Sequence, residues 1–132
     1  MEQLTKMTFP EGYVCQHREN IMALANMIGR KKPGLKAGDK GGYNWDDPEY
    51  VILEAGVTDE MCEVGLMLGS YVKKSAAEVA ALVGKPEDYC HEQLMKLAVY
   101  GACFVNCING VDQFWTETWI PGTMEMIVNN LD

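Results

Sequence analysis

The sequence has few of the features that mark a membrane or secreted protein. No apolar run reaches the roughly 20 residues that a transmembrane helix needs, and residues 1–12 contain no apolar core of a signal peptide. The five cysteines are an odd number and form no CxxC pair. These absences predict free thiols in a reducing compartment and a cytoplasmic location.

Sequence motifs for common catalytic and cofactor chemistry are also missing. Neither GxGxxG nor GxxxxGK(S/T) occurs, and the glycines between residues 34 and 42 match neither spacing. There is no GxSxG nucleophile turn. The two histidines and the scattered cysteines do not supply the clustered ligands of a structural zinc site. We therefore expect no catalytic, cofactor-binding or metal-binding residue in this chain.

Basic residues are scarce in the second part of the chain. The net charge is −8, made up of +3 in residues 1–44 and −11 in residues 45–132. An acidic surface repels phosphate backbones and provides no basic surface to which nucleic acid could bind. The exception is the basic stretch 30–40, which we interpret as part of a solvated linker.

The pattern of residues 1–44 indicates one helix and a loop. Ile21, Leu24, Ala25 and Ile28 follow helical spacing, so we predict a helix over residues 17–29 that ends at Gly29. The Gly- and Lys-rich residues 30–43 are typical of a mobile linker. We expect two units: residues 1–44, with this helix and linker, and residues 45–132.

Residues 45–100 contain several helix starts. Residues 45–48 (Trp-Asp-Asp-Pro) indicate a turn or helix start whose aspartates cap backbone N–H groups. A helix is predicted from Thr58 or Asp59 to Leu68, with Met61, Val64, Gly65 and Leu68 on its apolar face. Ser75 and Glu78 have capping-box spacing, and the helix that they begin should bury Val79, Leu82 and Val83. A longer helix should run from Pro86 to Tyr100, with Cys90, Leu94, Leu97 and Ala98 inward.

The last third of the chain predicts a hairpin and a helix. Residues 102–108 form an apolar run of strand type, and Asn109-Gly110, the residue pair that type I′ turns favour, follows it. Residues 111–119 are then expected to return as the second strand. After Pro121-Gly122, Thr123 should cap a final amphipathic helix. The expected class is mainly α with a β-hairpin: a winged-helix-like helix-turn-helix domain with an additional N-terminal and C-terminal helix. A four-helix bundle with a hairpin attached is the alternative.

A winged helix raises the question of DNA binding through the helix at residues 86–100. Base readout and phosphate anchoring depend mainly on Arg, Lys, Asn and Gln. The side chains expected to face outward include three carboxylates and one lysine, which argues against DNA. They are Glu87, Asp88, His91, Glu92, Gln93 and Lys96.

Aromatic side chains gather around the hairpin, and the nine methionines of the chain add adaptable apolar surface. The aromatic residues of this group are Tyr100, Phe114, Trp115 and Trp119. Such side chains fit either a protein core or an adaptable docking surface. If they form a docking surface, its expected residues are Trp115, Trp119, Met124, Ile127 and Val128.

Two cysteines on the first hairpin strand are candidates for redox chemistry. Cys103 and Cys107 are four residues apart on one face, which separates them by about 13 Å in a strand. That distance prevents a shared metal or disulfide, so we interpret both as small core residues.

Three segments resemble one known family. They are Trp45–Tyr50 (WDDPEY), Val57–Met61 (VTDEM) and Trp119–Asn130 (WIPGTMEMIVNN). Together they resemble, over residues 43–130, the N-terminal region of anaerobic-bacterial FAD-dependent pyridine nucleotide-disulfide oxidoreductases with ferredoxin-type iron–sulfur clusters. The resemblance implies that FAD, NAD(P) and the clusters bind downstream of this region. The chain would then be an excised N-terminal domain or a stand-alone relative.

These observations leave three functions open. The first is a non-catalytic accessory or interaction domain that docks on downstream redox domains, on a partner subunit or on a second copy of itself. The second is a winged-helix transcriptional regulator, which a basic outward helix would have favoured. The third is a small stand-alone redox protein using Cys103 or Cys107, which a CxxC pair would have favoured.

Overall fold

The computed structural model describes residues 14–32, 34–69 and 72–117. In this part of the chain, five α-helices and one 3₁₀ turn accompany a three-stranded antiparallel sheet, so the fold mixes helix and strand. The helices are α2 (Glu19–Ile28), α3 (Pro48–Gly56), α4 (Asp59–Gly65), α5 (Ala76–Val83) and α6 (Glu87–Tyr100), with η1 (Leu66–Leu68) extending α4. The strands are β1 (Lys74–Ser75), β2 (Phe104–Ile108) and β3 (Val111–Trp115).

The helix boundaries follow the capping residues. Thr58 Oγ1 accepts a hydrogen bond from the Met61 N–H, which begins α4. Ser75 and Glu78 form the complete capping box at the start of α5. Both caps confirm the predictions, because a cap depends only on side chains within one turn of the backbone that they satisfy.

Helix α3 was predicted only as a turn or a helix start. Pro48 stands at its first turn, where the missing N–H costs nothing. Asp47 precedes the helix but does not cap it with its side chain. Its Oδ2 instead accepts from the Asn44 N–H at 2.7 Å and so closes the preceding turn.

The hairpin has the predicted turn. Asn109 and Gly110 both have positive φ values, 53° and 80°, as a type I′ turn requires. The strands are shorter than predicted: β2 begins at Phe104 and β3 ends at Trp115. Strand β1 was not predicted, since it contains only two residues, and it pairs with β3 to give the sheet order β1-β3-β2.

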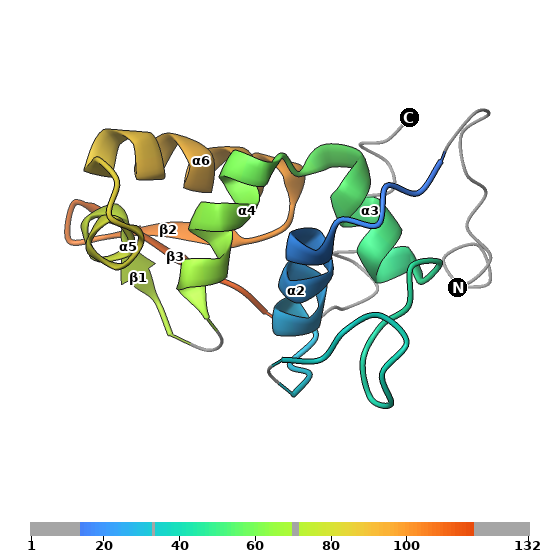
Figure 1. Cartoon of the computed structure of the whole chain (residues 1–132). Helices are drawn as coiled ribbons and strands as arrows, with labels where there is room; N and C mark the ends of the chain where they lie inside the picture. Colours follow the sequence, from blue (N-terminus) through green and yellow to red (C-terminus); the bar gives the residue numbers. More distant parts are fainter. Residues whose placement is uncertain (1–13, 33, 70–71, 118–132) are drawn as a thin grey trace.

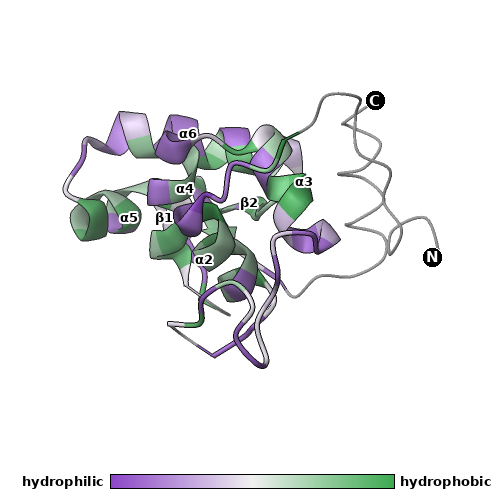
Figure 2. Ribbon diagram, turned by 45° about the vertical axis from the view of Figure 1, so that its right-hand side comes forward, coloured by the Kyte–Doolittle hydropathy of each residue, from purple (hydrophilic) through white to green (hydrophobic). Residues whose placement is uncertain are grey.

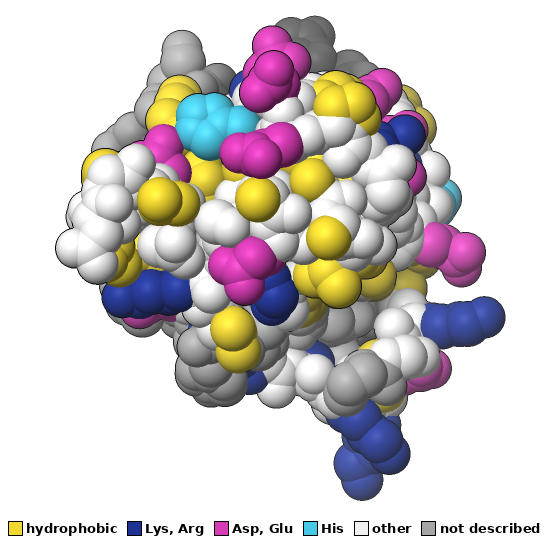
Figure 3. Space-filling model, turned by 90° about the vertical axis from the view of Figure 1, so that its left-hand side faces the viewer, with side chains coloured by type: hydrophobic (Ala, Val, Ile, Leu, Met, Phe, Trp, Pro, Cys, Tyr) yellow, Lys and Arg dark blue, Asp and Glu magenta, His cyan; other side chains and the backbone are white. Residues whose placement is uncertain are grey.

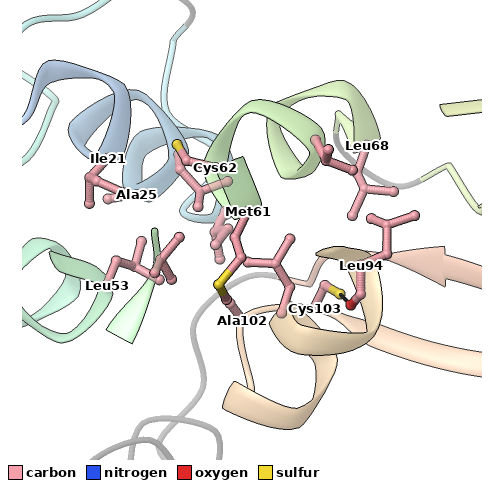
Figure 4. Packing of buried hydrophobic residues seen from close by; sticks show 14 of the residues in the cluster. Ile21, Ala25, Leu53, Met61, Cys62, Leu68, Leu94, Ala102 and Cys103 are labelled. Atoms are coloured by element: carbon pink, nitrogen blue, oxygen red, sulfur yellow. Dashed lines mark hydrogen bonds between the residues drawn. The ribbon is translucent and has the colours of Figure 1, made fainter. Parts of the chain in front are cut away.

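The core lies between the helices and one face of the sheet. In Figure 1, α4 stands between the pair α2 and α3 and the group formed by α5, α6 and the sheet. Side chains from all these elements meet in one apolar cluster, part of which Figure 4 shows. The cluster includes Ile21, Leu53, Cys62, Leu94 and Phe114, all fully buried. Helix α2, from the predicted N-terminal unit, thus shares its core with α3, α4, α5 and α6.

Two predictions of side-chain orientation were wrong. Leu82 was expected in the core but is 58% exposed, because Ala76, Val79 and Val83 form the inward stripe of α5 and Leu82 lies beside it. Gln93 was expected to face outward but is buried. It lies three residues after Cys90 and four before Leu97, so it belongs to the inward stripe of α6.

Candidate functional site on the outer sheet face

The strand register divides the sheet into two faces. Val105 pairs with Phe114, and Phe114 is fully buried against the core. Because side chains alternate along a strand, the neighbouring pair Phe104 and Trp115 lies on the opposite face. We call that opposite face the outer sheet face. Its residues on the hairpin are Phe104, Asn106, Ile108, Val111, Gln113 and Trp115.

An aromatic pair forms one end of the outer sheet face. The rings of Phe104 and Trp115 stack with centroids 5.8 Å apart and an interplanar angle of 21°. Lys73 Nζ lies 4.8 Å from the centroid of the Trp115 ring, and Trp115 Nε1 donates to Glu117 Oε1 at 3.4 Å. The indole is therefore held in one orientation while remaining partly exposed. A fixed, partly exposed indole is suited to anchoring a protein contact.

The other end of the outer sheet face is aliphatic. Ile108 and Val111 pair beside the turn and are 37% and 48% exposed. Asn106 and Gln113 pair between the two ends and add amide groups. An apolar surface with interspersed hydrogen-bonding groups has the composition of many protein interfaces.

The inner side of the hairpin is fixed to α6. His91 Nε2 and Asp112 Oδ2 lie 2.9 Å apart, and the His91 ring makes an edge contact with the Phe114 ring at 5.8 Å. These contacts connect α6 with β3 and give the outer sheet face a rigid support.

The exposed surface of α6 is mixed and acidic. Glu87, Asp88 and Glu92 are exposed, with Lys96 as the exposed cation of the helix. Val99 near its C-terminal end is 78% exposed. Figure 2 shows how much of α6 is hydrophilic compared with α5. In Figure 3, carboxylates gather along the upper part of the molecule, on the side where α6 lies in Figure 1.

The thiols differ in accessibility. Cys103 lies just before β2 and is buried; its Sγ donates to the Leu94 carbonyl at 3.6 Å (Figure 4). Burial raises the pKa of Cys103 to about 12, and it has the same effect on Cys62. Cys107 is exposed because it lies near the turn, so its interpretation as a core residue was wrong. A buried thiol with a raised pKa is a poor nucleophile.

Most of the predicted interaction residues lie outside the described residues: Trp119, Met124, Ile127 and Val128. Trp115 is described and lies on the outer sheet face. The other aromatic residues predicted around the hairpin are placed elsewhere. Phe114 is buried in the core. Tyr100 lies where α6 meets α3, and its hydroxyl donates to the Ile52 carbonyl at 2.6 Å.

Sequence reasoning missed Phe104 and Lys73 as parts of this surface. Phe104 could have been found from the sequence. Alternate residues of a strand share a face, so a two-residue hairpin turn places residues 104, 106 and 108 on the same face as 115, 113 and 111. The signal for Lys73 was absent, because its position depends on the unpredicted pairing of β1 with β3.

Within the described ranges, no group of three or more His, Cys, Asp or Glu side chains is arranged to hold a metal ion. No helix in that part of the chain is long and apolar enough to cross a membrane. Comparisons with protein-family models, with curated proteins and with solved structures found no match to this chain.

Proposed function

We propose that this chain is a winged-helix-type interaction domain that docks on another protein through its outer sheet face and performs no chemistry itself. The element order α4, β1, α5, α6, β2, β3 supports this fold type, with the β2–β3 hairpin as the wing. The observation that carries the proposal is the stacked pair Phe104 and Trp115, held in place and partly exposed.

The partner in this proposal is a redox protein. The resemblance of residues 43–130 to the N-terminal region of FAD- and iron–sulfur-dependent NAD(P) oxidoreductases supports the redox domains of such an enzyme, on the same polypeptide or on another subunit. The five free thiols support a reducing, cytoplasmic setting.

A winged-helix transcriptional regulator is the alternative that the element order favours. Its recognition helix would be α6. Three carboxylates against one lysine on the exposed surface of α6 oppose phosphate binding. The interaction domain is therefore the better supported function.

Site-specific photo-crosslinking in the source cells tests the proposal. Benzoylphenylalanine replaces Asn106, at the centre of the outer sheet face, and in a matched control it replaces the exposed Ala81 on α5. We expect the Asn106 position to crosslink to one discrete protein with a bound flavin, identified by mass spectrometry and absorbance. The control position should not yield this product.

A Trp115→Ala change in the crosslinking chain should abolish that product while the chain stays folded by circular dichroism. Crosslinking to DNA-bound complexes, or equal yields from both positions, would overturn the proposal. A product containing only a second copy of the chain would replace the redox partner with a homodimer.

A further inference from the structure

A cavity of about 420 Å³ lies between α2 and the loop that connects it to α3. Its floor and walls are mainly apolar: Met22 and Met27 come from α2, Leu35 and Trp45 from the loop, and Leu66 from η1. The cavity shares no lining residue with the outer sheet face and has no part in the docking function proposed above. Pockets of 300 Å³ or more that combine apolar walls with a few polar groups are typical of small-molecule sites.

The rim of this cavity is positively charged. Lys31, Lys32 and Lys36 line it, against the single carboxylate of Glu19. The loop forms the lowest part of the molecule in Figures 1 and 3, and lysines project from the same part of the space-filling view. Residues 45–132 carry a net charge of −11, so this concentration of lysines at the mouth of an apolar cavity favours an anion there.

Asn26 adds a buried hydrogen-bond donor to the lining. The residue is 4% exposed, and its Oδ1 accepts from the Tyr43 N–H at 3.1 Å, which fixes the orientation of the amide. Its Nδ2 is buried and has no hydrogen-bond partner among the described residues. Leaving a buried donor without an acceptor is destabilising, so a ligand with an acceptor at this position would supply the missing hydrogen bond.

We propose that this cavity binds a small amphipathic carboxylate whose apolar body carries a hydrogen-bond acceptor. The lysines of the rim hold the carboxylate, the side chains of Met22, Leu35 and Trp45 contact the apolar body, and Asn26 Nδ2 donates to the acceptor. The site would make the domain responsive to a metabolite of this chemical class.

Three probes separate these contributions. Benzoylpropionate has a phenyl ketone and a carboxylate; phenylbutyrate lacks only the ketone oxygen; phenylbutyramide lacks both the ketone oxygen and the negative charge. Titration of the full chain, followed by amide NMR shifts, should show benzoylpropionate shifting Ala23, Leu35 and Ala37. Phenylbutyrate should bind about fivefold more weakly, the loss of one net hydrogen bond. Phenylbutyramide should bind weakest of the three.

Two matched pairs of variants assign the site without changing Asn26, whose Oδ1 contact with Tyr43 helps to hold the loop. Lys36→Glu on the rim should weaken benzoylpropionate about fivefold by charge reversal, whereas Lys40→Glu, in the same loop but outside the lining, should have little effect. Ala23→Phe fills the cavity from an exposed helix position, and Ala81→Phe makes the same change on α5.

The expected result is loss of benzoylpropionate binding in Ala23→Phe, with unchanged binding in Ala81→Phe. Equal affinity for benzoylpropionate and phenylbutyramide would overturn the proposal, as would shifts that survive Ala23→Phe or an absence of shifts at millimolar probe. None of these outcomes affects crosslinking through Asn106, so the two proposals fail independently.

Discussion

Gly56 is the last residue of α3, and its missing side chain leaves room for Tyr100. A Cβ at this position would overlap the Tyr100 ring. The same ring is held by the hydrogen bond from its hydroxyl to the Ile52 carbonyl, and burial raises the Tyr100 pKa to about 12. The close approach of α6 to the end of α3 therefore depends on glycine.

Gly56→Ala should lower the free energy of unfolding by about 2 kcal/mol, because the tyrosine must move out of its packed position. Chemical denaturation followed by circular dichroism measures this change. In a Tyr100→Ala background, the same Gly56→Ala substitution should cost less than about 0.5 kcal/mol, since alanine favours a helix. A similar loss of stability in both backgrounds would mean that the contact with the Tyr100 ring does not cause the destabilisation.

The cysteines provide a second prediction at the residue scale. Under native conditions, iodoacetamide should alkylate Cys107 first, because it is exposed, and leave Cys62, Cys90 and Cys103 unmodified. Burial raises the pKa of all three of these thiols, so few thiolates form at neutral pH. Mass spectrometry of peptides after timed labelling tests this order. Rapid labelling of Cys103 would contradict its packing against Leu94.

At the scale of elements, α5 illustrates how one capping box responds to pH. The backbone N–H of Ser75 donates to Glu78 Oε1 at 2.9 Å, and this bond and the one from the Ser75 side chain lower the Glu78 pKa. A carboxyl whose pKa is lowered by folding stabilises the protein above its unfolded pKa. That contribution is lost as the pH falls through the folded pKa.

Glu78→Gln should therefore reduce stability at neutral pH, and the difference from the wild type should shrink as the pH falls through the acid range. Thermal unfolding at a series of pH values measures the difference. Glu87→Gln, in the first turn of α6, is the control for removing a carboxylate near a helix N-terminus. A constant difference between Glu78→Gln and wild type at all pH values would show that the Glu78 charge does not matter.

The elements that could be predicted were those with local signals. The caps at Thr58 and Ser75 and the hairpin turn at Asn109-Gly110 each depend on residues within three or four positions of one another. Each of them lies where the sequence predicted it. Strand β1 could not be found in this way, because two residues have no periodicity of their own and the strand exists only through pairing with β3. The cavity was missed for a similar reason: its walls combine α2 and the loop that follows it with Leu66 of η1, which is distant from both in the sequence.

At the scale of the molecule, the N-terminal helix is connected to the rest by more than one contact. Leu24 is buried, and its Cδ1 lies near Gly65 of α4. Arg30, just after α2, donates to the Thr116 carbonyl at 2.6 Å and to Thr116 Oγ1 at 3.1 Å. The Thr116 hydroxyl in turn donates to the Gly69 carbonyl at 3.0 Å. The boundary at residues 44 and 45 stays a prediction, but α2 packs in the same core as the described helices and strands that follow it.

Because α2 shares this core, we expect α2 and α6 to unfold together. Leu24→Ala should lower the free energy of unfolding by about 3 kcal/mol through the cavity that it creates. The opening free energies of α2 and of α6 should both fall by this amount. Native-state hydrogen exchange with mass spectrometry, in increasing denaturant, reports the two helices separately. In the wild type, peptides from both should reach the same opening free energy. If α2 opened at a lower free energy and Leu24→Ala left α6 unchanged, residues 1–44 would behave as a separate unit, and the cavity between α2 and its loop could open without unfolding the sheet.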